Sequence, residues 1–206
     1  MGNPRPHPPT VLIAAIFSRH SQALDWALQR FAAVRGQLLC VSDRFEHNET
    51  TYYNRLMGEG LRKQLLAVQG DFDPSELASV KLACNAWEAE YAQSNDFPEE
   101  RPLNIDPGYL TPMKVVLAST KDRAHRIYLR DGIYAEECLY YHQRSWQGRA
   151  WTYPDYLRPD YHVFLNRVRE QLQSRLSEMS RHSTMASRPD QIVPAPDPSD
   201  ERKLQR

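Results

Sequence analysis

Short apolar runs alternate with amphipathic stretches in the first part of the chain, and this pattern predicts strands separated by helices. Residues 11–18 (VLIAAIFS) form an almost continuous apolar run, which predicts a buried strand. Ser21 is a suitable N-cap, apolar residues then recur at helical spacing up to Arg35, and Gly36 is a typical helix stop. A second strand is expected at 37–45 (QLLCVSDRF), which completes a strand–helix–strand unit.

Further along the chain the same patterns predict one more strand and two more helices. Residues 57–69 fit either a strand or a short helix, and we interpret them as a strand. Pro74 lies where prolines open helices, and apolar residues recur at helical spacing from Leu77 to Tyr91, which predicts a helix there. A second such pattern predicts a helix at 161–179.

The central stretch from Leu103 to Leu139 combines turn residues with several apolar runs. Pro107 and Gly108 predict a rigid turn that leads into a strand. Three strands are then expected, at 113–120, 127–129 and 133–142. Asp131 and Gly132 form a tight-turn pair between the last two, so the segment is interpreted as a meander of antiparallel strands.

The order of these elements predicts an α+β domain. Its sheet is expected to be mixed or largely antiparallel, with helices packed on one face, in a βαββαβ-like order followed by a hairpin and a C-terminal helix. A single domain over residues 10–179 is expected, because 206 residues with 41% hydrophobic content support one substantial core. The proline-rich residues 1–9 and the polar residues 180–206 are predicted to be disordered.

Charge and cysteine content bear on partners and compartment. The 26 basic residues equal the 26 acidic ones, so no overall field attracts nucleic acid or an anionic membrane. The apolar run at 11–17 is too short to span a bilayer and lacks the layout of a signal peptide, so we expect no membrane association. Cys40, Cys84 and Cys138 lie among apolar neighbours, which is typical of reduced cysteines in a cytoplasmic protein.

A basic cluster in the central stretch is the main candidate for ligand binding. Its members are Lys114, Lys121, Arg123 and Arg126. Guanidinium and ammonium groups donate hydrogen bonds to phosphate and carboxylate, so the cluster indicates an anion site, with a phosphorylated or nucleotide-like ligand as the leading hypothesis. The alternative is a solvated hairpin whose charges face water. Neither GxxxxGK[ST] nor GxGxxG occurs, so no glycine-rich phosphate loop is indicated.

Asp106, His125 and Glu136 are candidates for acid–base or metal chemistry. Asp106 belongs to the predicted turn, which would aim its carboxylate at a ligand. Because adjacent strand residues point to opposite faces, only one of Glu136 and Glu137 can face the basic cluster. A cross-strand ion pair is the alternative for Glu136. The chain has neither a CxxC pair nor a zinc ligand set, and its sequence identifies no cofactor.

Aromatic residues after the central stretch raise a second hypothesis. Trp151, Tyr153 and Tyr156 could wall a pocket, cover the sheet or stack bases. In the last case the protein is a non-catalytic interaction module that binds RNA with the same cations. Site residues that converge in a concave pocket favour the small ligand, and an open sheet face favours RNA. The sequence leaves open whether the protein is an enzyme and how it oligomerises.

Four segments in this order resemble a known family: NIDPGYL (104–110), KVVLASTKDRAHRIYL (114–129), GIYAEECLYY (132–141) and WTYPDY (151–156). The family is the bacterial and archaeal one catalogued as domain of unknown function 4416, and the resemblance covers residues 10–172. It implies a shared fold and a shared site, without an established activity.

Overall fold

The computed structural model describes residues 2–3, 6–49, 53–94 and 96–186. Within the expected N-terminal arm, residues 6–9 carry no helix or strand. The expected C-terminal tail began at Ser180, but helix α4 (Pro159–Ala186) continues through its first residues. Once a helix has formed, each added residue gains a backbone hydrogen bond, so a polar sequence can extend it. The rest of the tail, 187–206, lies outside the described residues.

The described residues form eight strands and four α-helices. The strands are β1 (Val11–Ser18), β2 (Leu38–Glu46), β3 (Arg62–Val68), β4 (Asn104–Leu110), β5 (Lys114–Ser119), β6 (Ile127–Arg130), β7 (Ile133–His142) and β8 (Ser145–Gly148). The helices are α1 (Ser21–Arg35), α2 (Asn54–Met57), α3 (Leu77–Gln93) and α4, with 3-10 turns η1 (Pro74–Glu76) and η2 (Pro154–Leu157). The strand predicted within 57–69 is present as β3, and the first predicted helix has the bounds of α1.

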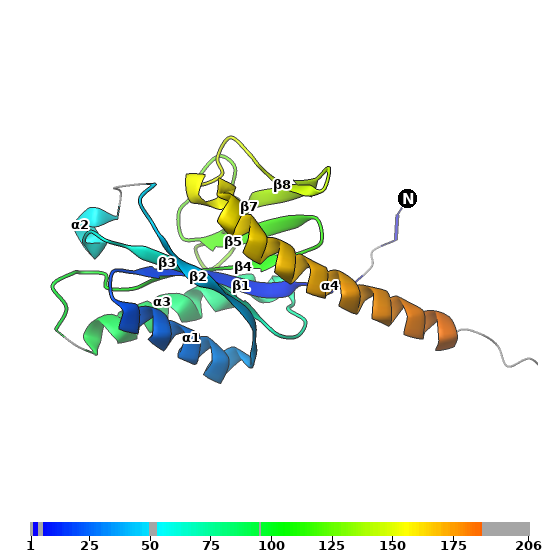
Figure 1. The fold of residues 1–206 in the computed structure, drawn as a ribbon, viewed down its shortest axis with the longest axis horizontal. Helices are drawn as coiled ribbons and strands as arrows, with labels where there is room; N and C mark the ends of the chain where they lie inside the picture. Colours follow the sequence, from blue (N-terminus) through cyan, green and yellow to red (C-terminus); the bar gives the residue numbers. More distant parts are fainter. Residues whose placement is uncertain (1, 4–5, 50–52, 95, 187–206) are drawn as a thin grey trace, which may run out of the picture.

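One antiparallel sheet holds all the strands, in the order β2-β3-β1-β4-β5-β7-β6, with β8 paired to β7. Strands β1 to β4 form a βαββαβ unit with α1 and α3, in which β3 lies between β1 and β2, as in ferredoxin-like domains. Figure 1 shows β1 in the middle of this arrangement, and all of its residues are buried. The α+β class and the antiparallel sheet predicted from the sequence are therefore confirmed.

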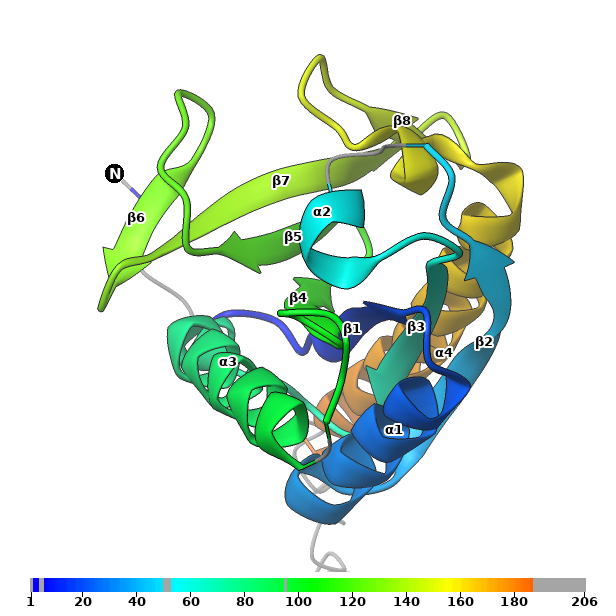
Figure 2. The ribbon, with the colours of Figure 1, turned by 90° about the vertical axis from the view of Figure 1, so that its left-hand side faces the viewer.

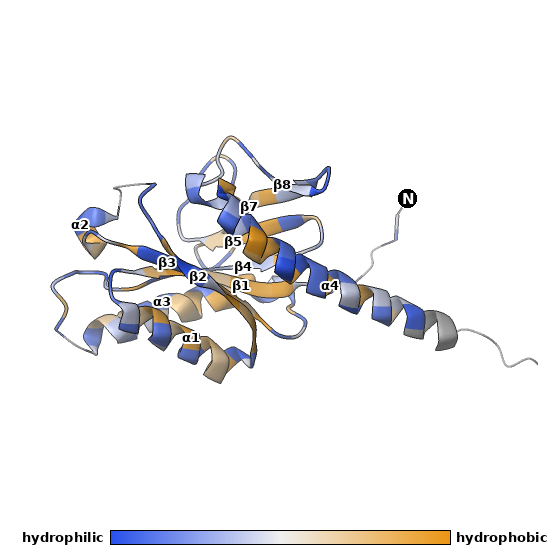
Figure 3. Ribbon diagram, viewed as in Figure 1, coloured by the Kyte–Doolittle hydropathy of each residue, from blue (hydrophilic) through white to orange (hydrophobic). Residues whose placement is uncertain are grey.

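Helices cover both faces of the sheet. Helices α1 and α3 pack on the face to which Leu12, Ala14 and Ile16 point, together on one side in Figure 2. Helix α4 packs on the other face, in the cluster that contains Ile13 and Ala15. The prediction of helices on one face thus holds for α1 and α3 and misses α4. The reason is that β1 is apolar on both faces, as its colour in Figure 3 shows, so each face needs a cover.

The segment around Pro107 and Gly108, predicted as a turn, is instead the interior of strand β4. It pairs with β1 along its whole length, with Ala14 opposite Pro107. The ladder between β4 and β5 begins only at Gly108, so the missing N–H of the proline removes no bond from that ladder. A Cβ atom at residue 108 would lie 2.2 Å from the carbonyl oxygen of Val116, which explains the glycine by close strand contact.

Strands β5, β6 and β7 do not follow chain order in space. Strand β7 pairs with both β5 and β6, so the expected meander has the wrong order although each expected strand is present. The polar connection 120–126 is long enough to pass the end of β7 and leave β6 at the edge of the sheet. The predicted tight turn at Asp131 and Gly132 is confirmed: their φ angles of 54° and 74° are the left-handed values of a two-residue hairpin.

Strands β4 and β5 separate part of the way along the sheet. They are joined by three residue pairs: Gly108–Leu117, Tyr109–Val116 and Leu110–Val115. Strand β4 nevertheless begins at Asn104, and β5 continues to Ser119. Beyond the ladder, residues of both strands line a pocket. The end of this ladder therefore determines where the candidate site lies.

The remaining sequence expectations concern cysteines and membranes. Cys40, Cys84 and Cys138 are buried and free of disulfides. Burial raises the pKa of the Cys84 thiol to about 12, so it stays protonated and unreactive at neutral pH. Across the described part of the chain, no helix has both the length and the apolar character needed to cross a membrane.

Candidate functional site

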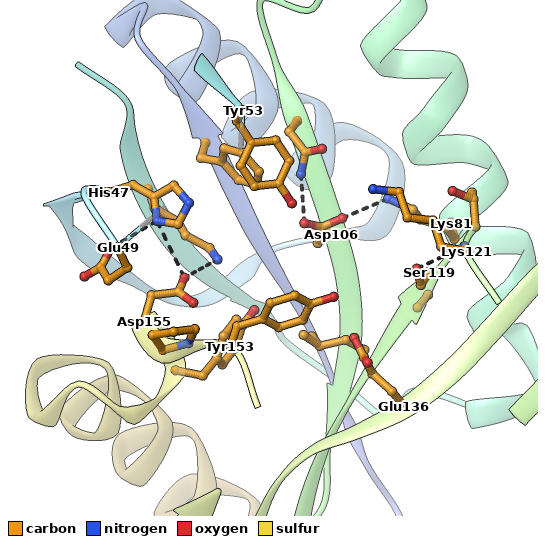
Figure 4. A pocket seen from close by; sticks show the side chains of 18 of the residues that line it. His47, Glu49, Tyr53, Lys81, Asp106, Ser119, Lys121, Glu136, Tyr153 and Asp155 are labelled. Atoms are coloured by element: carbon orange, nitrogen blue, oxygen red, sulfur yellow. Dashed lines mark hydrogen bonds and ion pairs between the residues drawn. The ribbon is translucent and has the colours of Figure 1, made fainter. Parts of the chain in front are cut away.

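A pocket of about 450 Å³ lies where β4 and β5 separate, and residues from distant parts of the chain line it (Figure 4). Strands β1, β3, β4, β5 and β7, helix α3, turn η2 and the loops after β2 and β5 all contribute to its walls. The charged lining residues are the cations Lys63, Lys81, Arg101, Lys121, Arg123 and Arg126 and the carboxylates Glu49, Asp106, Glu136 and Asp155. Six permanent cations against four carboxylates give this lining a net positive charge.

Arg126 forms the hub of a network on the β5–β7 side of the pocket. Its Nε donates to Glu136 Oε2 at 3.0 Å, and its Nη2 donates to Glu136 Oε1 at 3.3 Å and to Tyr153 Oη at 2.7 Å. Its Nη1 donates to Ser119 Oγ and to the Lys121 carbonyl oxygen, both at 2.8 Å. Every N–H of the guanidinium therefore has an acceptor within the protein. The network, here called the Arg126 network, positions the loop after β5.

Glu136 is the acceptor at the centre of this network and is almost fully buried, with a side chain 3% exposed. Its Oε2 also lies 2.8 Å from His125 Nε2. The His125 ring stacks on Trp151, with centroids 5.1 Å apart and planes 9° from parallel. The imidazole is thereby fixed beside the carboxylate, so Glu136 holds two successive residues of the loop after β5 in place.

Asp106 lies on β4 opposite this network, where Lys81 reaches it from helix α3. Lys81 Nζ lies 3.0 Å from Asp106 Oδ1 and 2.7 Å from the Ile105 carbonyl oxygen. Asn104 Nδ2 donates to Asp106 Oδ2 at 2.8 Å. Burial alone would raise the pKa of Asp106, but the ammonium groups of Lys81 and Lys63 outweigh it and hold the pKa below its usual range. Asp106 is therefore an ionised, fully engaged carboxylate at neutral pH.

Lys63 on β3 and Asp155 in η2 form a buried ion pair at the other end of the pocket. The Nζ–Oδ2 distance is 2.5 Å, and the two side chains are 6% and 3% exposed. The ammonium group also lies over two aromatic rings, 4.7 Å from the centroid of Tyr156 and 5.4 Å from that of Phe17. A buried charge of this kind is stable because its partners replace the lost water.

His47 and Glu49 form the wall next to this pair, and their polar atoms are only partly matched. His47 Nδ1 lies 3.3 Å from Glu49 Oε2 and 3.8 Å from Asp155 Oδ2. In the described part of the chain, both ring nitrogens of His47 and Oε2 of Glu49 are buried and have no hydrogen bond of good geometry. Glu49 Oε1 accepts from Arg158 at 2.7 Å. Burial, followed by the positive charge of Lys63, lowers the pKa of His47, so its imidazole is neutral at neutral pH.

The residues that the sequence suggested fall into three groups. Those that line the pocket are Asp106, Lys121, Arg123, Arg126 and Glu136. His125 contacts Glu136 without belonging to the lining. Lys114 lies at the other end of β5 from Ser119 and also does not belong to the lining.

The three aromatic residues also separate. Trp151 stacks on His125 and its Nε1 donates to the Glu137 carbonyl oxygen at 2.9 Å, so it covers the sheet edge. Tyr153 and Tyr156 wall the pocket, and Tyr156 is buried. Of the sequence alternatives, covering the sheet describes Trp151, and walling a pocket describes the two tyrosines.

Sequence reasoning left open whether Lys81 lies on the solvent side of its helix or in the wall of a cleft, and it assigned no site role to Lys63, Arg101, His47 or Glu49. Lys63 and Lys81 carried a detectable signal, because each is a charge at a position where the pattern predicts burial. Lys63 lies in a strand whose following residues are all buried, and Lys81 shares the buried face of α3 with Leu77 and Cys84. His47 and Glu49 carried none, since both lie in a polar segment whose burial depends on tertiary contacts.

Comparison with known proteins places the chain in a family. A family model described as "Domain of unknown function (DUF4416)" matches residues 8–172. The chain belongs to this family. No curated protein and no solved structure matches the chain.

All pocket residues fall within the DUF4416 match. Each of the four segments on which the sequence resemblance rested supplies at least one of them: Asp106, Lys121, Glu136 and Tyr153 are examples. Among the described residues, no group of three or more His, Cys, Asp and Glu side chains is placed to hold a metal ion. The side chains in the pocket that can donate hydrogen bonds carry ammonium, guanidinium, hydroxyl and imidazole groups.

Proposed function

We propose that this protein binds a phosphorylated or nucleotide-like small molecule in the pocket between β4 and β5. The observation that carries the proposal is the excess of cations over carboxylates in a single enclosed lining. Two of these cations, Lys63 and Lys81, are buried, with side chains 6% and 4% exposed. Buried ammonium groups act through a lower effective dielectric than exposed ones, so they attract an anion more strongly.

Lys81, Lys121 and Arg123 are the residues we assign to the anion. Lys81 Nζ has two protein acceptors, and an ammonium group can donate three hydrogen bonds, so one is left for a ligand. Lys121 and Arg123 lie on the exposed loop after β5 and line the same pocket. Arg126 is assigned a positioning role instead, because its donors are occupied by the Arg126 network.

The size and walls of the pocket support a ligand larger than an inorganic anion. Its volume of about 450 Å³ lies within the usual range for small-molecule sites. Phe17, Tyr53, Tyr153 and Tyr156 contribute aromatic surface to the lining. Aromatic surface of this kind can pack against a sugar or a base, and a free phosphate has no such part.

The RNA hypothesis receives less support from the same contacts. RNA-binding sheets present aromatic residues on an open face, where bases can stack. Here both faces of the sheet at β1 are packed against helices, Trp151 is stacked on His125, and Tyr156 is buried. As part of the proposal we place the protein in the cytoplasm, where its buried free cysteines would remain reduced.

A thermal-shift titration with inorganic phosphate, ribose 5-phosphate and AMP tests the proposal. A ligand that binds only the folded state raises the melting temperature with its concentration. The double variant Lys121→Ala/Arg123→Ala is expected to weaken binding by about tenfold or more, because each lost charged hydrogen bond contributes about 1.5–3 kcal/mol. Lys114→Ala is the control: it removes a cation from β5, the strand that precedes this loop, outside the pocket.

Two results would contradict the proposal. One is the absence of any shift with all three probes. The other is an equal loss of binding in the double variant and in Lys114→Ala, which would indicate a general charge effect rather than a site. Raising the salt concentration should weaken binding in the unmodified protein, because screening acts on the charged contacts.

A further inference from the structure

His47 combines burial, a position in the pocket wall and an absence of hydrogen bonds. Its side chain is 4% exposed, and among the described residues neither ring nitrogen has a hydrogen bond of good geometry. Leaving buried polar atoms unmatched costs stability, so such atoms in a pocket wall point to a ligand that matches them. Figure 4 shows His47 on the same side of the pocket as Glu49 and Asp155, with one ring nitrogen joined by dashed lines to both carboxylates.

The neighbours of His47 determine which nitrogen carries the proton. Glu49 Oε2 and Asp155 Oδ2 both lie on the Nδ1 side, at 3.3 and 3.8 Å. Two carboxylates there stabilise a proton on Nδ1, which leaves Nε2 as a lone-pair acceptor. Burial and the nearby Lys63 also lower the pKa of His47, which keeps the ring neutral. Within the pocket wall, the ring therefore keeps one buried acceptor, Nε2.

Glu49 adds a second incompletely matched acceptor beside the first. Its Oε2 faces His47 Nδ1 at 3.3 Å and, among the described residues, has no hydrogen bond of good geometry, while its Oε1 is held by Arg158. A group that satisfies both acceptors must donate hydrogen bonds. A cationic amine is disfavoured, because the buried ammonium of Lys63 lies at the same end of the pocket, 2.5 Å from Asp155. Neutral hydroxyl groups fit these conditions.

We propose that His47 and Glu49 form a hydroxyl-binding subsite, and that the ligand is a phosphorylated sugar whose hydroxyl groups donate to His47 Nε2 and Glu49 Oε2. This inference rests on the proposed function, since the cations Lys81, Lys121 and Arg123 supply the site for the phosphate. The subsite lies across the pocket from those cations (Figure 4). The ligand thus spans the pocket, with its anionic end at the loop after β5 and its hydroxyl end at His47.

The sugar phosphate can come from two sources: a free sugar phosphate or the sugar–phosphate part of a nucleotide. Isothermal titration with ribose 5-phosphate and AMP distinguishes them, because only AMP adds a base. Inorganic phosphate and 2-deoxyribose 5-phosphate are the matched probes that lack all or one of the hydroxyl groups. The unmodified protein is expected to bind at least one hydroxyl-bearing probe about tenfold or more tightly than inorganic phosphate.

His47→Phe is the decisive variant. It keeps an aromatic ring in the wall and removes both nitrogens, so it should abolish the preference for the hydroxyl-bearing probe while leaving the affinity for inorganic phosphate unchanged. His47→Gln is the rescue variant, since its amide oxygen can accept near the position of Nε2, and it should restore part of the preference. Lys114→Ala, outside the pocket, should behave like the unmodified protein in all four titrations.

The melting temperature provides an independent readout. If the nitrogens of His47 form hydrogen bonds only with a ligand, they destabilise the ligand-free protein. His47→Phe should then leave the melting temperature unchanged or raise it. A fall in melting temperature together with equal loss of all four probes would show that His47 is structural, and would overturn the inference. So would a hydroxyl preference that survives in His47→Phe, or no preference in the unmodified protein. If inorganic phosphate still binds in either of these two cases, the proposed function stands without the hydroxyl subsite. If none of the four probes binds, the proposed function and the subsite are both wrong.

Discussion

Two clusters of buried polar residues face each other across one pocket, and they differ in how completely their atoms are paired. In the Arg126 network every guanidinium N–H has an acceptor, and Glu136 accepts from both Arg126 and His125. In the opposite wall, as far as the structure describes it, both nitrogens of His47 and one oxygen of Glu49 have no hydrogen bond of good geometry. Both clusters are similarly buried, so burial alone does not distinguish a scaffold from a binding surface.

This difference in hydrogen-bond pairing distinguishes structural residues from ligand-binding residues, which sequence patterns do not distinguish. A fully paired charge network fixes backbone segments relative to each other, and removing one member leaves the others unsatisfied. An incompletely paired wall is costly in the empty protein and is explained by what a ligand supplies. On this basis we assign Arg126 to the scaffold, although its sequence context indicated ligand binding, and the proposed subsite assigns His47 to the binding surface.

The largest expected effect comes from breaking the Arg126 network. Arg126→Met should lower the free energy of unfolding by about 3–5 kcal/mol, because it leaves the buried carboxylate of Glu136 without its main partner. Urea denaturation measures the change. Arg123→Met, an exposed arginine on the same loop, is the control and should change stability by less than about 0.5 kcal/mol. Equal effects of the two substitutions would place Arg126 outside the scaffold.

The buried pair of Lys63 and Asp155 should behave as scaffold within the otherwise unmatched wall. Lys63→Met should cost about 3 kcal/mol of stability, since it leaves Asp155 buried beside Glu49 with its closest counter-charge removed. Adding Asp155→Leu should recover much of that loss, because the unpaired charge is then gone. A double variant as unstable as the sum of the two single variants would contradict this interpretation. Chemical denaturation of all four proteins completes the cycle.

Tyr153 tests the edge of the Arg126 network, where one neutral hydroxyl is involved. Tyr153→Phe removes the acceptor of one Arg126 N–H and should lower the unfolding free energy by about 1 kcal/mol. In the double variant with Arg126→Met, the further loss should be close to zero, because the interaction is already absent. An additive double variant would show that the tyrosine acts independently of Arg126.

The pH dependence of stability tests whether His47 is buried in its neutral form. Folding lowers the pKa of His47 below its ordinary value of 6.5, so the unfolded chain takes up the proton first as the pH falls. Stability should therefore decrease as the pH falls below about 6.5, down to the folded pKa. Melting temperatures from pH 8 to pH 5 measure this slope. In His47→Phe the slope should be shallower, and an unchanged slope would assign it to other groups.

The sequence predicted the elements better than their arrangement. The apolar run of β1, the spacing in α1 and the Asp131-Gly132 turn each follow from local chemistry, and each appears where expected. The interior of β4 was predicted as a turn, because Pro107 and Gly108 are typical turn residues. The strand tolerates them because its ladder with β5 is short and because Val116 approaches residue 108 closely. That information is tertiary and is not present in a local pattern.

The candidate site divides in the same way. The basic cluster and the acids Asp106 and Glu136 could be found because they are concentrated in one stretch of sequence. Lys114 belongs to the same stretch of sequence but lies at the far end of its strand, outside the pocket. Nearness in sequence therefore added one residue that is not part of the candidate site. His47 and Lys63 come from β2–β3 and meet Asp155 only after folding. No spacing rule connects residues so far apart along the chain.

The short ladder between β4 and β5 has a mechanical consequence. The three pairs from Gly108 to Leu110 connect the ferredoxin-like half of the sheet to the half that contains β5, β7 and β6. A ligand held by Lys81 on one side and by Lys121 on the other would fasten the two halves together on the open side of this joint. Ligand binding should then slow amide hydrogen exchange in β4 and β5 more than in β2 and β3, because the ligand would contact elements on both sides of this joint.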